Sequence, residues 1–281
     1  MIENQFKEVR EAWSKSATYW EKHRDVIRSM FSPVTRALVE AAGVQAGQNV
    51  LDVAGGAGEP SLTLARLVGP SGRVAYTDLV QEMVEAAERQ ARRSHIENIS
   101  FHQAPAESLP FLDDSFDAGV CRFGAMFFFD PDLACREMAR VVKPGGKLAF
   151  AVWDRRESNP FFGIVADAIS KFIEPAPEEP DAPGAFRYIE PGSFAAVLDK
   201  AGLTDVTEYT LRFSIEAPIS LDMFWQTRVE ISESLRDKVA RLSAGQIEQA
   251  RHSAETSAAP YFAGDAMSIP AQAIIVSAVA S

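Results

Sequence analysis

The sequence predicts an α/β fold in which helices cover both faces of a parallel sheet. Short apolar segments alternate with longer segments whose apolar residues recur at helical spacing. The predicted strands are Asn49–Val53, Arg73–Thr77, Ile99–His102, Phe116–Cys121 and Lys147–Trp153, and the predicted helices are Glu59–Val68, Val80–Arg92 and Pro131–Val142. A turn is predicted at Lys143–Gly146, because Pro and Gly end helices. Since helices of this length separate the strands, we expect the strands to run parallel.

Composition and charge narrow the class of protein. The 281 residues are 47% hydrophobic, which is enough to form a large core, and they carry a formal net charge of −11. A nucleic acid would require a basic face, so we expect no nucleic-acid partner. Cys121 and Cys135 fit neither a metal site nor a disulfide framework, and no apolar run is long enough to span a membrane. We therefore expect a cytoplasmic enzyme or binding protein with no metal and no transmembrane segment.

The flanking regions are predicted to be mainly helical. Residues 1–31 carry apolar and aromatic side chains at helical spacing, and residues 220–254 form a second helical region with an apolar cluster that includes Phe224. The other elements predicted here are the helix Gly192–Ala201 and the strands Asp205–Phe213 and Ala271–Val279. Glu174–Pro183 contains four prolines and four acidic residues, so it is predicted to be a loop or lid.

The glycine-rich segment Val50–Pro60, VLDVAGGAGEP, lies where parallel α/β proteins bind ligands, between the first strand and the following helix. Its glycines permit positive φ angles and close approach of a ligand to the backbone. A dinucleotide site would need G-x-G-x-x-G, but the third glycine is absent and Glu59 would place a negative charge beside the pyrophosphate. Asp52 adds a second carboxylate. The segment therefore favours a ligand that carries positive charge and no phosphate.

S-adenosylmethionine fits these requirements, because it carries a sulfonium and an ammonium group. A carboxylate such as Asp52 can organise the contacts to its amino group, directly or through water. Asp78 ends the second strand 26 positions later, where an acid accepts hydrogen bonds from ribose hydroxyls. Dinucleotide sites share this acid, and Asp78 could alternatively cap the helix at Val80. The preceding Asp52 and glycines favour the ribose role.

Four segments in order resemble the successive motifs of class I S-adenosylmethionine-dependent methyltransferases: VLDVAGGAG, AYTDL, APAESLPFLDDSFDAGVCRF and LACREMARVVKPGGKLAFAVW. The likeness covers roughly residues 45–153 and is greatest to the branch that includes the ubiquinone/menaquinone biosynthesis C-methyltransferases. That family often has glycine at the position of Ala54 and a polar residue or cysteine at that of Gly55. The resemblance implies a Rossmann-like, mostly parallel seven-stranded sheet with an antiparallel last strand and a helical cap. Asp205–Phe213 and Ala271–Val279 would be its sixth and seventh strands.

The resemblance also implies which residues bind the cofactor. The methionine end would lie against Asp52, Ala54, Gly55, Gly56 and Gly58, and Asp78 would bind the ribose. The residues implied for the adenine side are Leu79, Met83, Ala106 and Glu107, and those near the sulfur are Cys121, Arg122 and Phe123. Tyr19 or Trp20 of the N-terminal segment would close over the cofactor.

An aromatic site suits the chemistry that this cofactor supports. Transfer of the methyl group removes the charge of the sulfonium, so a dry, apolar site favours the transition state over the charged ground state. The segment RFGAMFFFD after the fourth strand fits such a wall, although part of it would also pack on the next helix. The expected substrate-binding residues are Met126, Phe127, Trp153 and Phe224. His23 is the candidate general base, because it lies on the segment predicted to cap the site.

Five parts are predicted along the chain: an N-terminal helical cap (1–44), the cofactor-binding core (45–154), the remainder of the core with a lid segment (155–215), a helical cap insertion (216–268) and the last core strand (269–281). The predicted function is S-adenosylmethionine-dependent transfer of a methyl group to carbon or oxygen of a small, largely apolar or aromatic molecule. Two alternatives stay open, a nicotinamide-dependent oxidoreductase and a non-catalytic S-adenosylmethionine-binding protein. Binding of NAD alone would favour the first, and cofactor binding without turnover would favour the second.

Overall fold

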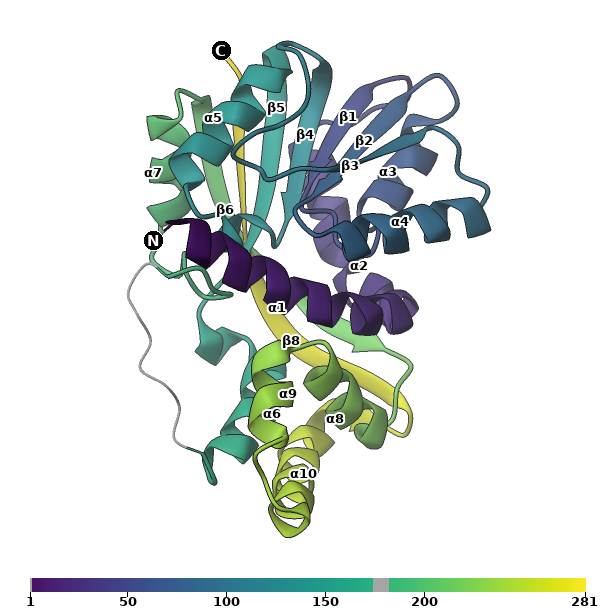
Figure 1. Ribbon diagram of the computed structural model, residues 1–281, viewed down its shortest axis with the longest axis vertical. Coiled ribbons are helices and arrows are strands. Elements are labelled where there is room, and N and C mark those ends of the chain that lie inside the picture. Colours follow the sequence, from purple (N-terminus) through teal and green to yellow (C-terminus); the bar gives the residue numbers. More distant parts are fainter. Residues whose placement is uncertain (1, 174–181) are drawn as a thin grey trace.

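The computed structural model describes residues 2–173 and 182–281, so most of the predicted lid Glu174–Pro183 lies outside the described residues. A single sheet fills the upper half of the molecule (Figure 1). Its strands are β1 (Asn49–Val53), β2 (Arg73–Asp78), β3 (Ile99–Gln103), β4 (Phe116–Arg122), β5 (Val142–Trp153), β6 (Thr204–Ala217) and β8 (Ala266–Val279). Their order is β3-β2-β1-β4-β5-β8-β6, and the two-residue β7 (Phe262–Ala263) pairs with β8. The order contains the predicted seven strands.

The sheet is parallel except for its last strand. β1 pairs in parallel with β2 and β4, and β3 and β5 extend the sheet in the same direction. β8 runs antiparallel to both of its neighbours, β5 and β6. The predicted mostly parallel sheet with an antiparallel last strand is therefore confirmed. Because the carboxyl ends of β1, β2, β4 and β5 meet at one edge, the loops that follow these strands lie side by side.

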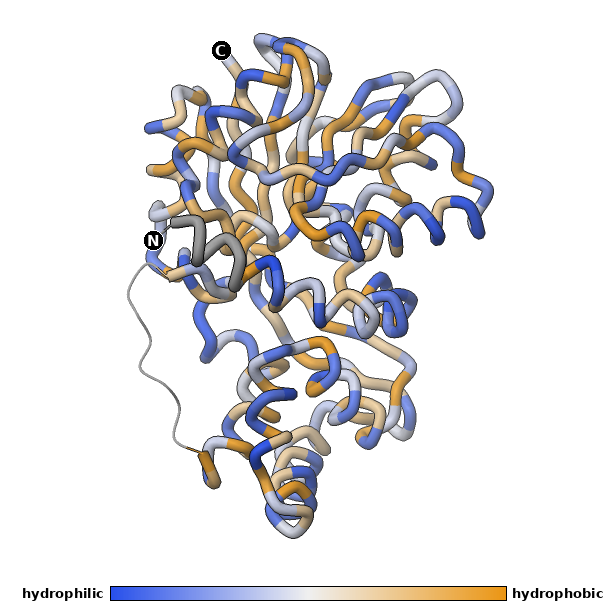
Figure 2. The backbone as a smooth tube through the Cα atoms, viewed as in Figure 1, coloured by the Kyte–Doolittle hydropathy of each residue, from blue (hydrophilic) through white to orange (hydrophobic). Residues whose placement is uncertain are grey.

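Helices cover both faces of this sheet, as predicted. One face is covered by α2 (Arg24–Ala41), α3 (Ser61–Val68) and α4 (Gln81–Arg93), and the other by α5 (Pro131–Val141) and α7 (Ser193–Lys200). Successive strand residues point to opposite faces, so Val50 packs with helix residues such as Leu38, whereas Leu51 belongs to the cluster that contains Met138. In Figure 2 the colours alternate along α4, which buries one side and exposes the other.

The lower half of the molecule is helical. α1 (Ile2–Lys22) crosses below the sheet, and α6 (Pro160–Ser170), α8 (Leu221–Glu230), α9 (Glu233–Val239) and α10 (Ala244–Ala258) lie beneath it (Figure 1). Three single-turn 3-10 helices, Ala125–Phe127, Arg156–Ser158 and Ala259–Tyr261, complete the described elements. Among these helices none is both long enough and apolar enough to cross a membrane.

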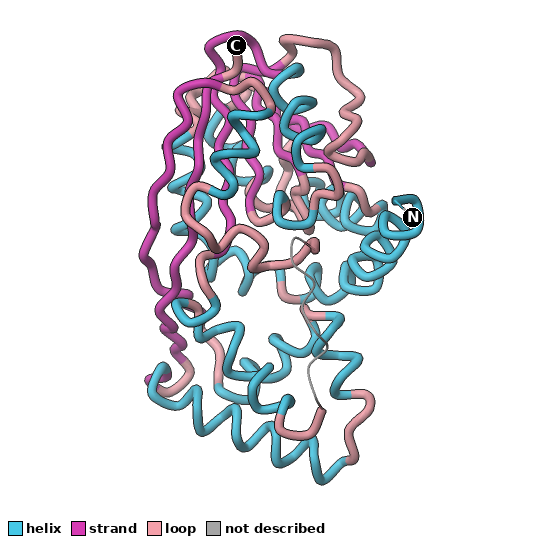
Figure 3. The backbone as a smooth tube through the Cα atoms, turned by 90° about the vertical axis from the view of Figure 1, so that its left-hand side faces the viewer, coloured by secondary structure: helices cyan, strands magenta, loops and turns pink. Residues whose placement is uncertain are grey.

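Two long strands connect the halves. β6 and β8 remain paired from Thr204 and Val279 down to Ala217 and Met267, whereas β5 leaves β8 after Ala273. Figure 3 shows the pair running along one side of the molecule into the lower half. Where β5 ends, the buried Asn159 takes its place, because its Oδ1 accepts from the backbone N–H of Gln272 at 3.0 Å and its Nδ2 donates to the Gln272 carbonyl at 3.1 Å.

Several predicted boundaries differ from the structure. The predicted turn Lys143–Gly146 lies within β5, as a bulge in its pairing with β4, because the Gly145 N–H donates to the distant Ala280 carbonyl at 2.8 Å. The last two strands extend well beyond the predicted limits toward the helical half, and β8 already begins at Ala266. The predicted helical region 220–254 consists of three helices, α8 to α10.

Candidate functional site

A cavity of about 590 Å³ lies where the loops after β1, β2, β4 and β5 face the helical half. This volume is in the range of roughly 300–1,000 Å³ that is typical of small-molecule sites. The sheet side of the wall includes Gly56, Asp78 and Trp153. The helical side includes Trp20 of α1 and Arg228 of α8, so the cavity is enclosed by segments from both halves of the chain.

The turn after β1 presents bare backbone to this cavity. A Cβ at Gly55 would lie 2.4 Å from the ring of Tyr76, whose hydroxyl donates to the Gly56 carbonyl at 2.6 Å. Gly56 has a φ of 55°, and no atom lies within 4 Å of the place that a Cβ would take. Ala54 also adopts a left-handed φ, 58°, which costs roughly 1–2 kcal/mol in a residue other than glycine. The turn thus has the shape of a cradle that a side chain would fill.

Asp78 connects this turn to the next strand. Its Oδ2 accepts from the Gly56 N–H at 3.0 Å, and its Oδ1 accepts from the Val80 N–H at 2.9 Å. Burial raises the pKa of Asp78 to about 6, even though these backbone hydrogen bonds act in the opposite direction. A carboxylate has about four acceptor positions, so both oxygens can accept further hydrogen bonds from a ligand in the cavity that Asp78 lines. Asp78 is not the N-cap of α4, whose N-cap residue is Val80 without a side-chain cap; its bond to the Val80 N–H lies ahead of that helix.

Asp52 was expected to organise the contacts to the methionine end directly or through water; it lies behind the turn and does not itself line the cavity. It is fully buried, and its Oδ2 accepts from the hydroxyl of Ser61, the first residue of α3, at 2.5 Å. Its Oδ1 has no hydrogen-bond partner among the described residues. Burial raises the pKa of Asp52 to about 7, and the bond from Ser61 offsets part of that effect. Asp52 therefore joins β1 to α3 beneath the glycines.

The expected adenine-side residues do line the cavity. Leu79 and Met83 form an apolar cluster with Trp13 and Trp20 of α1, whose rings lie 5.7 Å apart. Ala106 and Glu107 line the same region. The Glu107 Oε1 accepts from the backbone N–H groups of Phe129 and Asp130, at 2.9 and 3.3 Å, which ties the loop after β3 to the loop after β4.

Four rings form an aromatic box at the other end: Phe31, Phe123, Trp153 and Phe162. Phe123 stacks on Trp153 at 4.1 Å between ring centroids, and Phe31 packs edge-on against both. Phe162 meets Trp153 at 4.9 Å. Phe123 has a φ of 63°, an unusual backbone conformation for a bulky residue, and it directly follows β4.

Three more predicted residues lie at this cavity. Met126 lines it and accepts from the Trp153 N–H through sulfur at 3.3 Å, and Phe127 packs edge-on against Trp13 at 5.2 Å. Arg122 lines it as well, but its Nη1 donates to the Thr35 hydroxyl at 2.9 Å and its Nη2 to the Glu59 carbonyl at 2.8 Å. Arg122 therefore joins α2 to the glycine turn.

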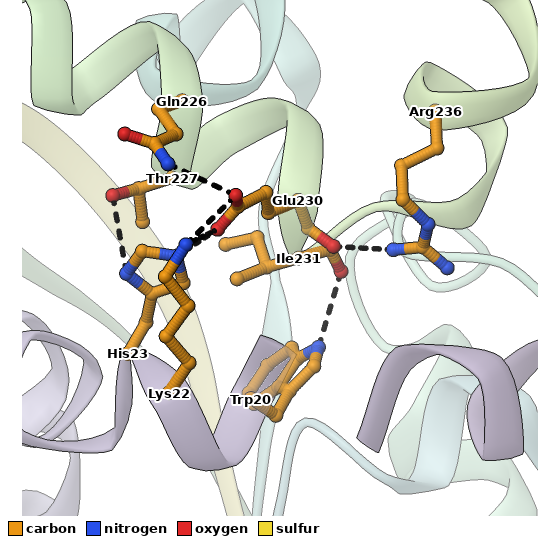
Figure 4. Close-up of polar contacts among 8 residues, drawn as sticks. All are labelled: Trp20, Lys22, His23, Gln226, Thr227, Glu230, Ile231 and Arg236. Carbon is orange, nitrogen blue, oxygen red and sulfur yellow. Dashed lines mark hydrogen bonds and ion pairs between the residues drawn. The ribbon is translucent and has the colours of Figure 1, made fainter. Parts of the chain in front are cut away.

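A set of contacts joins the end of α1 and His23 to residues 226–236 on the helical side of the cavity; we call it the latch (Figure 4). Glu230 accepts from Lys22 at 2.7 Å and from Gln226 at 3.0 Å, and it contacts His23 at 2.5 Å. Partial burial alone would raise the pKa of Glu230, but these hydrogen bonds together lower it to about 2. The Trp20 Nε1 donates to the Ile231 carbonyl at 3.1 Å, and Arg236 donates to the Glu230 carbonyl.

His23, the candidate general base, belongs to the latch and not to the cavity wall. His23 does not line the cavity. Its Nε2 contacts Glu230, and its Nδ1 lies 3.4 Å from the Thr227 hydroxyl, so both ring nitrogens face polar groups of α8 (Figure 4). The expectation of a catalytic role is corrected, because His23 joins α1 to the helical insertion.

Four other predicted residues also lie away from the cavity. Tyr19 packs under the Arg236 guanidinium at 4.8 Å, and Phe224 is buried between Phe161 and Phe262. Cys121 is fully buried in the sheet, where burial raises the pKa of its thiol. Gly58 has a φ of 112° and permits close packing of the turn against α4 rather than contact with a ligand. These residues support the walls of the site.

The structure adds residues that the sequence did not single out for the site. Phe162 of α6, Ile231 and Arg228 line the cavity, and all three follow Trp153 in the chain. The apolar spacing of α6 could have indicated a packed helix, but no local pattern marks Arg228. Within residues 2–173 and 182–281, no group of three His, Cys, Asp or Glu side chains is arranged to hold a metal ion.

Comparisons with known sequences show which family this chain resembles. The family described as ubiE/COQ5 methyltransferase matches residues 1–173. The ubiquinone/menaquinone biosynthesis C-methyltransferase of Cronobacter sakazakii is 34% identical over 194 residues, covering 65% of this chain and 76% of the relative. The protein of the same name from Hahella chejuensis is 40% identical over 136 residues, covering 48% and 54%. The chain thus spans about half the length of the Hahella and Pseudomonas putida relatives it matches.

Solved structures share the fold at low sequence identity. The YcgJ protein from Bacillus subtilis has a TM-score of 0.55 at 22% identity, covering 87% of this chain and 97% of its own. Phosphoethanolamine N-methyltransferase 2 from Haemonchus contortus, in complex with phosphomonomethylethanolamine and S-adenosylhomocysteine, has a TM-score of 0.57 at 16% identity, covering 95% and 59%. These similarities support the architecture alone.

Proposed function

The chain belongs to the ubiE/COQ5 methyltransferase family, and we propose that it transfers a methyl group from S-adenosylmethionine to a carbon atom of a small aromatic acceptor. One observation carries the proposal: a single cavity joins the glycine turn and Asp78 at one end to the aromatic box at the other. Relatives named as C-methyltransferases favour carbon over oxygen as the methylated atom.

The residues present fit the cofactor. The open space at Gly56 admits a ligand to the backbone, and the ionised Asp78 offers acceptors for two ribose hydroxyls. The acidic side chains of Asp52 and Glu59 near the turn disfavour a phosphate. S-adenosylmethionine, once bound, supplies a methyl group on a positively charged sulfur.

The chain's own contribution is placement and exclusion of water. Trp13, Trp20, Leu79 and Met83 enclose the adenine side, and the aromatic box encloses the acceptor side. Aromatic rings attract a sulfonium only weakly through cation–π contacts, whereas water would solvate it strongly. Less stabilisation is therefore lost when methyl transfer neutralises the charge. Holding the two reactants in line accounts for much of the rate acceleration expected from such a site.

Calorimetry with S-adenosylmethionine and S-adenosylhomocysteine tests the proposal. We expect both to bind with micromolar dissociation constants, typical of enzyme ligands. Asp78→Ala should weaken binding at least ~100-fold, because it removes two hydrogen bonds to a charged group that contribute roughly 1.5–3 kcal/mol each. Asp199→Ala, an exposed position on α7, is the matched control and should bind as the wild type does. Absence of binding, or binding of NAD instead, would show that the proposal is wrong.

A further inference from the structure

Arg228 is a buried cation at the acceptor end of the cavity. Its residue is 5% exposed, yet it lines the cavity wall from α8. Its position lies outside residues 1–173, the part of the chain that the family match covers, so the match says nothing about its role. A buried guanidinium in an apolar wall is costly unless a partner compensates its charge.

No such partner is present among the described residues. The one hydrogen bond of the Arg228 side chain runs from Nε to the Phe161 carbonyl, at 3.0 Å, and no carboxylate of the described chain forms an ion pair with it. Burial, the one cause acting on it, lowers the pKa of Arg228 to about 10, so the group stays cationic at neutral pH. By contrast, Arg140 is paired with both Glu137 and Asp113.

The surroundings fix the orientation of the free donors. The Arg228 Cζ lies 4.4 Å from the ring centroid of Phe161 and 5.2 Å from that of Phe162. These cation–π contacts hold the planar group without using its N–H groups. With Nε occupied, the terminal nitrogens retain four N–H donors, in the fork geometry that matches a carboxylate. The site is thus built to receive two oxygens that share a negative charge.

The aromatic box links Arg228 to the reacting end of the cavity. Phe162, beneath the guanidinium, packs on Trp153, and Trp153 stacks on Phe123. Phe123 lies next to Gly124, which packs closely on the glycine turn: a Cβ added at Gly124 would lie only 2.4 Å from the Cβ of Ala54. A flat molecule along these rings would therefore have one end near the cofactor and the other at Arg228.

We propose that the methyl acceptor is an aromatic carboxylic acid whose carboxylate binds Arg228 while its ring lies in the aromatic box. This inference rests on the proposed function and names the substrate class of the same site. The carboxylate would compensate the buried charge, and the fork would fix which ring atom faces the methyl group. A neutral acceptor would leave the guanidinium unpaired in a closed site.

The cofactor's own carboxylate is the competing anion. Arg122, rather than Arg228, is the arginine in direct contact with the glycine turn, through the Glu59 carbonyl. Arg228 contacts α6 instead, and it is connected to Trp153 through Phe162. This arrangement favours the acceptor, and the experiment separates the two anions.

The test uses the full chain saturated with S-adenosylhomocysteine. Binding of three acids, benzoate, naphthalene-2-carboxylate and biphenyl-4-carboxylate, is compared by calorimetry with that of their neutral carboxamides. We expect at least one acid to bind 10-fold or more tightly than its amide. Arg228→Met should abolish that preference, and Arg228→Lys should retain part of it, since the charge remains but the fork is lost. Arg251→Met, an arginine of α10 away from the cavity, is the matched control and should keep the full preference.

Each result decides the question. If no acid binds better than its amide, or if Arg228→Met keeps the preference, the proposal is wrong. It is also overturned if Arg228→Met weakens S-adenosylhomocysteine binding 10-fold while Arg251→Met does not, because Arg228 would then hold the cofactor. Should Arg228→Met fail to show a cooperative melting transition, Arg228→Lys and the wild-type preference decide. Failure of the wild type to bind S-adenosylhomocysteine would instead refute the proposed function.

Discussion

The two ends of the cavity are positioned in different ways. At the cofactor end, backbone groups at neighbouring strand ends hold the site in place: the Gly56 N–H and the Val80 N–H both donate to Asp78. At the acceptor end, side chains from distant segments meet, as when the Arg228 Nε donates to the Phe161 carbonyl 67 positions earlier. The sheet therefore fixes the glycine turn and Asp78, whereas the acceptor end depends on how α6 and α8 pack together.

This difference shows which part of the site is held by the sheet and which part depends on a few side-chain contacts. Strand pairing holds the cofactor end through many cooperative backbone hydrogen bonds, so single side chains there tune charge more than shape. The helical side of the cavity, by contrast, is held to α1 by a few side-chain contacts in the latch. We expect perturbations of the two ends to differ in kind as well as in size.

Asp52→Asn should give the largest effect on stability, and the effect should depend on pH. Since the pKa of Asp52 is raised to about 7 in the folded protein, the folded state binds the proton more tightly than the unfolded state. The contribution of Asp52 to wild-type stability is therefore greatest below its ordinary pKa and is lost as pH rises toward 7. Asparagine cannot ionise, so the variant should gain about 1–3 kcal/mol relative to wild type between pH 4 and 8.

Urea unfolding of the ligand-free protein at several pH values measures this difference. Asp199→Ala, the exposed control on α7, should run parallel to the wild type across the same range. A difference between Asp52→Asn and wild type that stays constant with pH would contradict a buried, titrating carboxylate beneath the turn.

Glu230→Ala should break the latch and leave the glycine turn and the sheet intact. The change removes hydrogen bonds to Lys22, His23 and Gln226, at an expected cost of about 1–2 kcal/mol given the partial exposure of the carboxylate. Hydrogen exchange should speed up in α1 and α8 but not in β1. Glu248→Ala, at an exposed position of α10, is the control. Equal acceleration in the sheet would mean that the two ends are not separate.

Ala54→Gly should have the smallest effect. Glycine adopts the left-handed φ of this position without strain, but it also increases the freedom of the unfolded chain. The net change in the free energy of unfolding should be a stabilisation of up to about 1 kcal/mol. Thermal unfolding measures it, and a clear destabilisation would mean that the Ala54 methyl group packs more tightly than its conformation costs.

The same difference decides what the sequence could predict. Gly56 and Asp78 were identified because strand, turn and acid follow one another at a regular local spacing. The role of Arg228 depends on Phe161, 67 positions earlier, and no local pattern encodes that distance. His23 was expected to act from the segment that caps the site, but it lies at the turn between α1 and α2 and its ring contacts Glu230 instead of lining the cavity. The predicted turn at Lys143–Gly146 was wrong for a similar reason, because its partner is Ala280.

The ribbon of β6 and β8 has a mechanical consequence for this architecture. Below the end of β5, residues 212–217 and 267–272 form a two-stranded strip that carries the whole segment between them. Such a strip bends readily perpendicular to its surface and resists shear within it. The segment between β6 and β8 is therefore held in three ways: by the strip, which Asn159 bonds at Gln272, by the latch to α1, and by the bond from Arg228 to the Phe161 carbonyl of α6. Because Arg228 lies on this segment and Phe161 lies on α6, the position of the guanidinium depends on how the strip holds the segment against α6.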